Sequence, residues 1–576
     1  MHIKNELYQI KLLNNLLNII SRKRKRQLII ISFLIIFNGI AEIFTLSSIE
    51  PLLKIISNKN NLIDGFITND LYYSITNFFN IDKTVFILVI FISILSITTI
   101  LRLFTIFLIN YVSALIGNEI GTLAYSNCLS QNYAYHLNTN SSKIISTIVT
   151  KTNSSVDTIK SFLNIFTSFI ILISILITLL KINAQITIFT ISAVTIFYFL
   201  IFKIIKDRLF RISKFRSELI QNQTQILQEG LGFVKDIILD KCQSLFIDQF
   251  KFKDKSLRII DAKSDFFASA PKYLIELITI FFLLIFSSIY SFNSDNNLQL
   301  IPLIGSIAFG MQRLLPTTQQ IYASYVIIST NYISVIDTLN LIKRPSITLQ
   351  KTRRKVIFKN NLELKNISFR YNNKSNYIIK NFNLKIKKGE RIGIIGESGR
   401  GKSTLIDILM GLIKPTLGEI FIDGESLHNS KRRFYLEKWY SAISHVPQSI
   451  YLSDGTIATN IAFGSKESEI DIDKLNISLK EAQLNNFIKE NPLGINAKVG
   501  ENGVQLSGGQ RQRIGIARAI YKGGEVIFLD EATSSLDEET EKAIIECISE
   551  LDRKYTIIII SHKKDILDFC DRIINL

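Results

Sequence analysis

The chain has 576 residues, a formal net charge of +18, and 47% hydrophobic against 20% charged residues. With so few charged residues, this composition is apolar-rich for a soluble protein and suggests a membrane part, and the length has room for two or three domains. The four cysteines (Cys128, Cys242, Cys547 and Cys570) show no paired CxxC spacing, which argues against a disulfide framework or a cysteine metal site.

Long apolar stretches dominate the first 340 residues. Six of them approach or exceed the ~20 residues needed to cross a bilayer, at about 28–56, 84–111, 162–180, 185–205, 273–292 and 298–325. We therefore predict an all-α transmembrane domain with six spans over residues 1–340. The N-terminus has no short apolar core followed by a small-residue cleavage site, so no removable signal peptide is expected.

Basic residues flank the predicted spans unevenly. Residues 22–26 are all Arg or Lys, and the connection after the fourth span is also basic, whereas the connections on the opposite side are poor in both. This bias predicts that both termini are cytoplasmic. It also explains the positive charge without nucleic acid. A nucleic-acid patch at 22–26 is the disfavoured alternative, because an apolar span follows at once.

The connections on the cytoplasmic side are far longer than ordinary loops, at about 50 residues after the second span and about 65 after the fourth. We expect helices that continue the spans, with turns near 133–136 and 232–240 touching a soluble domain; simple solvated connections are the alternative.

On the other side of the membrane, residues 62–79 show near-helical apolar spacing. They predict a short helix on the outer membrane surface or packing against the span ends.

Four charged residues fall at membrane depth: Glu42 in the first span, Arg102 in the second, Glu276 near the inner end of the fifth and Arg313 in the sixth. Ionisable groups there normally face a cavity or a partner charge. They predict the lining of a substrate cavity for an anionic or polar cargo. A structural Glu–Arg pair, or snorkelling of Arg102 to the interface, is the alternative. Pro316 is expected to kink or loosen the sixth span.

After a basic linker over 341–358, residues 359–576 change to short strands, turns and helices. An apolar strand, Arg391–Ile395, leads into a Gly-x4-Gly-Lys-Ser phosphate loop and then a helix at 404–413. Backbone N–H groups of such a loop surround phosphates, its lysine reaches the terminal phosphates and its serine ligates Mg²⁺. The predicted nucleotide-binding residues here are Gly396, Ser398, Gly399, Gly401, Lys402, Ser403 and Thr404.

A second apolar strand, 526–529, ends in two carboxylates. Asp530 suits the Mg²⁺ side of a nucleotide site, and Glu531 suits the positioning and polarising of an attacking water. A strand that merely ends in surface acids is the alternative, which the upstream phosphate loop disfavours.

Between these motifs lies Leu506-Ser507-Gly508-Gly509-Gln510, and here the chain resembles the exporters of the ATP-binding cassette (ABC) transporter superfamily, whose signature sequence this is. The resemblance implies a P-loop α/β nucleotide-binding domain over 359–576, an ATPase that uses ATP and Mg²⁺. It also implies a homodimer in which Ser507, Gly508, Gly509 and Gln510 of one subunit close over ATP held by the other.

The resemblance assigns roles to further residues. Tyr371 matches the aromatic that stacks on adenine, and Gln448 matches the glutamine that senses and ligates Mg²⁺. Asp537 lies in the loop that crosses the dimer interface, and His562 matches the switch histidine that contacts the terminal phosphate. With Glu531, the predicted catalytic residues are His562 and Gln448. The chain departs from the family pattern at Arg400, Ser535 and Lys563, none of which is an essential group.

Short motifs in the membrane half resemble bacterial flippases for lipid-linked oligosaccharides. They are Arg313-Leu314-Leu315-Pro316 and Ile321–Tyr325, with similarity around Glu42 and Arg102. The resemblance implies ATP-driven flipping of a polyprenyl-diphosphate oligosaccharide across the bacterial cytoplasmic membrane by alternating access. It also implies an external helix at 62–79 and membrane lipids as surroundings. The alternative is another amphipathic substrate: a lipid A-like glycolipid, a drug or a peptide.

Overall fold

The computed structural model describes residues 3–49, 52, 83–182, 184–293, 300–345, 358–371, 376–397, 399–428, 434–531 and 536–576. The predicted external helix at 62–79 lies outside these residues, as do Ser398, Ser534, Ser535 and most of the predicted linker. The chain divides into two compact units, one of residues 1–131 and 136–346 and one of residues 132–135 and 347–576.

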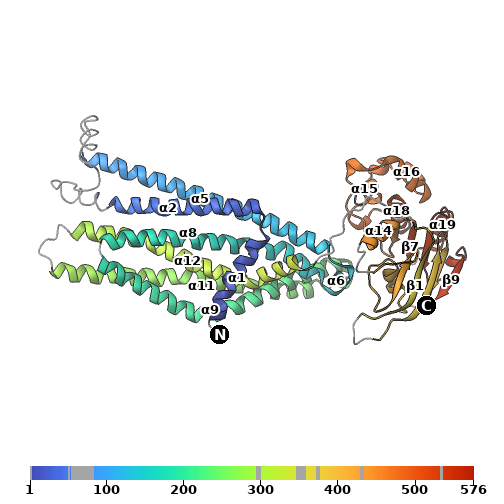
Figure 1. Ribbon diagram of the computed structural model, residues 1–576, viewed down its shortest axis with the longest axis horizontal. Helices are drawn as coiled ribbons and strands as arrows, with labels where there is room; N and C mark the ends of the chain where they lie inside the picture. Colours follow the sequence, from blue (N-terminus) through green and yellow to red (C-terminus); the bar gives the residue numbers. More distant parts are fainter. Residues whose placement is uncertain are drawn as a thin grey trace. The chain divides into compact units, whose positions relative to one another are not determined.

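The first unit consists of helices, several of them much longer than a bilayer is thick (Figure 1). Their bounds are α1 Ile3–Ile19, α2 Arg22–Ser47, α5 Lys83–Leu129, α6 Tyr133–Asn138, α7 Ser141–Ser146, α8 Thr152–Ile182, α9 Ala184–Gly232, α10 Val234–Leu239, α11 Gln243–Asn293 and α12 Leu300–Lys343. A π-helical turn, Thr147–Lys151, leads into α8. The 49-residue α9 continues unbroken from its apolar part into its basic part, as expected for a span extended beyond the membrane.

Five stretches of the described helices are long and apolar enough to cross a membrane: Arg22–Ser47, Leu88–Leu129, Ser141–Ile182, Thr187–Gly232 and Gly305–Lys343. They correspond to five of the six predicted spans. The fifth predicted stretch, at 273–292, lies in α11 and is not among them, and many of its side chains lie outside the described residues.

Helix α2 shows why these helices suit a bilayer. Its outward face is strongly apolar, with Phe33 68% and Phe37 58% exposed in the isolated chain. Its inward face buries polar groups, among them Asn38, which donates to Thr105 Oγ1 at 2.6 Å, and Glu42. Apolar side chains directed outward and hydrogen-bonded polar groups directed inward are what hydrocarbon surroundings favour.

Small residues let these helices approach closely. A Cβ on Gly39 of α2 would lie 2.5 Å from Ile170 Cγ2 of α8, and one on Gly310 of α12 would lie 2.4 Å from Leu179 Cδ2 of α8.

Helix α12 runs through Pro316 as one helix, although the proline predicted a disturbance there. The hydroxyl of Thr317 donates to the carbonyl of Arg313 at 2.9 Å, so a side chain adds a hydrogen bond beside the turn that the proline weakens.

A buried cation joins three helices of this unit. Lys151, 1% exposed in the π-helical turn before α8, donates to Asp337 Oδ2 of α12 at 2.5 Å and to Ser217 Oγ of α9 at 2.7 Å. Ser217 also donates to the same carboxylate oxygen at 2.8 Å. Within the described helices, the ammonium therefore depends on one carboxylate for its neutralisation.

Replacing Asp337 with asparagine is expected to lower the free energy of unfolding by about 3 kcal/mol, because it leaves Lys151 as an uncompensated buried charge. Thermal unfolding of the purified protein in one detergent measures the change. Arg258→Gln is the control: its pair with Asp254 is formed by a 78% exposed guanidinium, so its loss is expected to change the stability far less. Equal thermal stability of Asp337→Asn and Arg258→Gln would contradict the assignment of Asp337 as the counter-charge of Lys151.

The second unit contains two sheets with helices around them (Figure 1). Its strands are β1 Asn361–Phe369, β2 Ile379–Lys387, β3 Arg391–Ile395, β4 Leu417–Ile422, β5 Glu425–Ser426, β6 Ile443–Val446, β7 Val526–Asp530, β8 Thr556–Ile560 and β9 Arg572–Asn575. Its helices are α13 Lys402–Leu409, α14 Phe434–Ala442, α15 Ile457–Ile461, α16 Ile472–Glu481, α17 Asn485–Glu490, α18 Gly508–Lys522 and α19 Glu538–Ser549.

The antiparallel sheet has the strand order β2-β1-β4-β5 and the parallel sheet has the order β6-β7-β8-β3-β9. Strand β7 is buried on both faces: Val526 and Phe528 belong to one core, while Ile527 and Leu529 belong to the other. A continuous apolar run is what a parallel strand covered on both sides requires. Because β3, β7 and β8 are parallel, their carboxyl ends lie at the same edge of this sheet. The predicted site residues follow these ends.

Candidate functional site

The phosphate loop follows β3 and ends at α13, as the sequence predicts. Gly399 and Gly401 have φ values of 83° and 93°, a region that residues with a side chain rarely adopt, so glycine is required for this turn. The ammonium of Lys402, 5% exposed, donates to the carbonyl oxygen of Gly396 at 2.6 Å. The lysine is thus folded back into the hollow of its own loop, where phosphate oxygens would be its partners in a nucleotide complex.

Residues from three other segments form one connected group with Lys402. His562, after β8, places Nδ1 3.2 Å from Lys402 Nζ and Nε2 2.8 Å from Glu531 Oε2. Gln448, after β6, donates from Nε2 to the same Glu531 oxygen at 3.0 Å. Two residues predicted to be catalytic, His562 and Gln448, therefore contact the carboxylate of the third, Glu531.

Glu531 has an unusual backbone, with a φ of 47° directly after the buried strand β7. Its N–H donates to the carbonyl of Ile560 at 3.1 Å, which holds the residue at the edge of β8. Non-glycine residues in this region are uncommon and concentrate at functional sites. The strain directs a carboxylate that is 12% exposed toward Lys402 and His562.

The preceding residue, Asp530, suits a divalent cation. Its Oδ1 is buried without a hydrogen-bond partner among the described residues. Burial, and next the charge of Glu531, raise the pKa of the Asp530 carboxyl, whereas its hydrogen bond with Ser403 and the charge of Lys402 lower that pKa. A cation at the orphan oxygen would favour the charged carboxylate. One carboxylate, one hydroxyl and one amide, from Asp530, Ser403 and Gln448, fit Mg²⁺, which usually keeps several waters.

Tyr371 stands beside the same loop. Its hydroxyl lies 3.1 Å from Thr404 Oγ1 in the first turn of α13, and its ring packs edge-on against Phe369 with 5.0 Å between centroids. The tyrosine remains 51% exposed, which leaves ring surface for stacking. The position agrees with an aromatic that covers a nucleobase next to bound phosphates.

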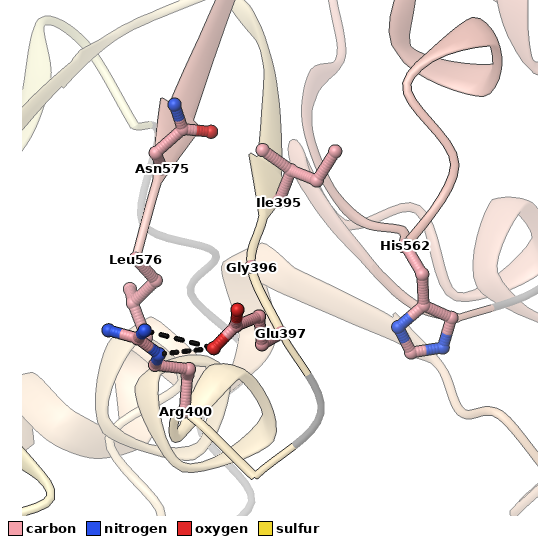
Figure 2. Close-up of a pocket in the computed structure, with 7 residues that line it drawn as sticks. All are labelled: Ile395, Gly396, Glu397, Arg400, His562, Asn575 and Leu576. Atoms are coloured by element: carbon pink, nitrogen blue, oxygen red, sulfur yellow. Dashed lines mark hydrogen bonds and ion pairs between the residues drawn. The ribbon is translucent and has the colours of Figure 1, made fainter.

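A hollow of about 760 Å³ opens beside the loop (Figure 2). Its lining is formed by Ile395, Gly396, Glu397, Arg400, His562, Asn575 and Leu576. Figure 2 shows the Arg400 guanidinium turned to Glu397, at 2.9 Å, with the His562 ring apart from this pair. Arg400 is 59% exposed, so the departure from the usual small residue does not fill the phosphate hollow.

The signature segment is placed differently from the other site residues. Ser507 caps α18, with its Oγ accepting from the N–H of Gln510 at 3.2 Å and its own N–H donating to Gln510 Oε1 at 2.9 Å. Gly508 and Gly509 lie against Leu536 and Thr540, at the beginning of α19. Asp537 caps α19 by accepting from Thr540 N–H at 2.9 Å. These residues form a second cluster that faces α19 rather than the phosphate loop.

The family model for the ABC transporter domain matches residues 379–534. The chain also superimposes on the structure of a bacterial Atm1-family ABC exporter with ATP bound, with a TM-score of 0.76 at 19% identity, over 96% of this chain and 93% of that one. The chain carries an ABC transporter domain on an ABC exporter fold. The predicted superfamily and the predicted fold class, an all-α membrane domain followed by a P-loop α/β domain, are confirmed.

Curated relatives match this chain over about a third of their own length. An ATP-dependent lipid A-core flippase from Ralstonia nicotianae is 36% identical over 216 residues, and one from Pseudoalteromonas translucida is 41% identical over 215 residues. Each alignment covers 37% of this chain and 36% of the relative. ABC transporter B family member 13 of Arabidopsis thaliana is 36% identical over 215 residues, which is 17% of that protein.

Two features of the ABC transporter domain had no signal in the sequence. Asp407 of α13 lies near Asp530, and burial, followed by the charge of Asp530, raises the pKa of Asp407 to about 6. Lys563, noted only as a departure from the family pattern, forms an ion pair with Glu541 of α19. Both depend on packing between segments that are distant in the chain.

Proposed function

We propose that two copies of this chain form an ATP-driven exporter that flips a lipid-linked glycan across the bacterial cytoplasmic membrane. The observation that carries the proposal is the convergence of Lys402, Gln448, Glu531 and His562 in a domain whose chain has the exporter fold. Both termini and the ATPase domain would be cytoplasmic, since the basic residues 22–26 precede the first span.

The proposed site residues divide the work of ATP hydrolysis. Lys402 and the backbone N–H groups of the phosphate loop would bind the phosphates, and Tyr371 would stack on adenine. Ser403, Gln448 and Asp530 would hold Mg²⁺, which neutralises charge on the phosphates. Glu531 would orient and polarise the attacking water, and His562 would bind the terminal phosphate.

One chain supplies one phosphate loop and one signature segment, and the two clusters face different neighbours within the chain. A complete site would therefore combine Lys402 of one subunit with Ser507, Gly508 and Gly509 of the other, with Asp537 near the interface. A symmetric pair satisfies both halves at once. ATP would favour the closed pair, and its hydrolysis would release it, which shifts the membrane helices between two states.

The substrate proposal rests on charges within the membrane helices. Glu42, 2% exposed, accepts from Arg102 Nη2 at 2.9 Å and from Arg313 Nη1 at 3.0 Å. Two guanidinium groups share one carboxylate, so the cluster has a net charge of about +1 (two positive groups and one negative). The arginines keep 39% and 22% of their side chains exposed. The surplus charge suits a phosphate or diphosphate of a lipid carrier.

We propose a polyprenyl-diphosphate oligosaccharide as the finer assignment, supported by the motif around Arg313 and by this cationic cluster. A lipid A-core glycolipid is the second candidate, supported by the names of the similar flippases. Both substrates combine a lipid, an anionic phosphate and a sugar. The cationic cluster therefore supports this class of substrate without distinguishing the two candidates.

Replacing Arg313 with alanine is expected to lower the apparent affinity for the flipped lipid by about tenfold or more, because a charge-assisted hydrogen bond to phosphate is lost. Proteoliposomes with fluorescent short-chain polyprenyl-diphosphate glycan, or with lipid A-core glycolipid, measure flipping under ATP. Arg313→Lys should recover part of the activity, and Arg258→Ala, at a 78% exposed site, should match the unaltered protein.

Three outcomes decide between the candidates. Unaltered flipping by Arg313→Ala refutes the cationic-cluster assignment. Flipping of the lipid A-core glycolipid but not of the diphosphate glycan replaces the first substrate with the second. A reconstituted protein that hydrolyses no ATP refutes the transport proposal as a whole.

A further inference from the structure

An ion pair joins the segment after β8 to α19. Lys563 Nζ lies 2.6 Å from Glu541 Oε2, and the Glu541 side chain is only 6% exposed. The other carboxylate oxygen, Oε1, is buried and has no hydrogen-bond partner within the described part of the chain. Among the described residues, Lys563 is thus the counter-charge of the buried Glu541 carboxylate, and a buried charge strongly favours keeping its partner.

Lys563 is adjacent to the predicted switch histidine. Its N–H donates to Ser561 Oγ at 3.0 Å, and Ser561 N–H donates to the carbonyl of Ile394 in β3 at 3.2 Å. His562 extends from the same turn to Glu531 at 2.8 Å. The two-residue segment is therefore fixed on one side by the nucleotide site and on the other by α19.

At α19, Glu541 follows Thr540, which packs on the signature segment. A Cβ on Gly509 would lie 2.4 Å from Thr540 Cγ2, and one on Gly508 would lie 3.1 Å from Leu536 Cδ2. The beginning of α18 and the first turn of α19 are consequently in close contact, and a displacement of one requires a displacement of the other.

We propose that Glu541 and Lys563 are a positioning pair that ties His562 of the nucleotide site to the signature segment of the same subunit. The proposal rests on the proposed dimer, in which that signature segment faces the partner's nucleotide. The pair then couples the two ATP sites: closure of the signature segment over one nucleotide acts through Thr540, Glu541 and Lys563 on the histidine of the other site. Neither Glu541 nor Lys563 is among the residues proposed to bind nucleotide, so we expect their effect to be exerted through His562.

ATP hydrolysis by the full-length dimer in nanodiscs tests this pair, with kcat, KM and the Hill coefficient measured for ATP. Lys563→Met and Glu541→Gln are expected to lower kcat by about tenfold and to move the Hill coefficient toward 1. KM should change less than about twofold, because Lys402 and Tyr371 are untouched. Lys563→Arg should retain cooperativity, since it keeps the charge.

The matched control is a second, exposed ion pair of α19, Lys542 with Glu538, at 2.9 Å and with side chains 74% and 79% exposed. Lys542→Met is expected to leave kcat and cooperativity unaltered. Lys563 is 58% exposed, so its truncation creates no core cavity and the variant should fold; thermal unfolding checks this.

The proposal would be overturned if Lys563→Met had the same kcat and Hill coefficient as Lys542→Met. Equal losses in Lys563→Arg and Lys563→Met would also overturn it. A rise in KM at constant kcat would also overturn it, since that result assigns the pair to binding. These outcomes leave the proposed exporter intact, whereas an unaltered protein without ATPase activity would remove both proposals.

Discussion

Glutamine in place of Glu531 is expected to reduce kcat for ATP hydrolysis by about 10²–10⁴-fold, the usual contribution of a positioned general base. The amide keeps the size of the side chain and an oxygen that can accept from Gln448 Nε2, now at 3.0 Å. It loses the negative charge that faces His562 Nε2 at 2.8 Å and can no longer polarise water. ATP binding should persist, because Lys402 and the loop backbone are unaltered, so the variant should accumulate as an ATP-bound dimer.

Steady-state hydrolysis in nanodiscs with Mg²⁺ and direct nucleotide binding together measure this separation of binding from chemistry. Glu469→Gln is the matched control, since Glu469 pairs with Lys466 at 3.8 Å and both side chains are more than 60% exposed, at 63% and 82%. Retention of more than about a tenth of the activity by Glu531→Gln would exclude Glu531 as the group that activates water.

Much of the nucleotide site could be predicted because its signals are local. The strand Arg391–Ile395 agrees with the prediction residue for residue, since a short apolar run followed by a glycine-rich loop is typical of a buried parallel strand. The helix after the loop is shorter than predicted, ending at Leu409 rather than near residue 413. Gly411, with a φ of 75°, explains the early end, because a left-handed residue terminates a helix.

The contacts between distant residues could not be predicted from local patterns. Glu42 and Arg313 are 271 residues apart, and the sequence left open whether they form a pair or line a cavity. Their meeting depends on the rotation and close approach of α2 and α12, which small residues and interhelical packing determine. The same holds for Lys151 and Asp337, 186 residues apart, whose helices show no local sign of a buried charge.

The strained backbone of Glu531 is a further feature that the sequence could not supply. Asp530 and Glu531 are chemically alike and adjacent, yet one has an orphan oxygen suited to a cation and the other faces His562. The φ of 47° at Glu531 separates the two carboxylates into different directions. The residue types predicted a cation ligand and a group that activates water. The backbone turn explains why Asp530 suits the first role and Glu531 the second.

Neutralising Glu42 is expected to destabilise the membrane unit far more than neutralising Arg102. Glu42→Gln leaves two guanidinium groups at membrane depth without a counter-charge, and breaking a buried pair in this way costs about 3–5 kcal/mol. Arg102→Gln leaves the pair of Glu42 with Arg313, at 3.0 Å, intact. Thermal unfolding of the three proteins in one detergent, with the fraction of dimer recovered, measures the difference.

The double variant Glu42→Gln with Arg102→Gln separates charge balance from packing. Together the two substitutions leave one unpaired arginine, whereas Glu42→Gln alone leaves two. The double variant should therefore be more stable than Glu42→Gln, and a double-mutant cycle should give a favourable coupling energy. Equal destabilisation by Glu42→Gln and Arg102→Gln would show that Glu42 is not the shared counter-charge. The surplus positive charge that is proposed to attract a phosphate exists only if one carboxylate serves both arginines, so this asymmetry tests the basis of substrate recognition without any substrate.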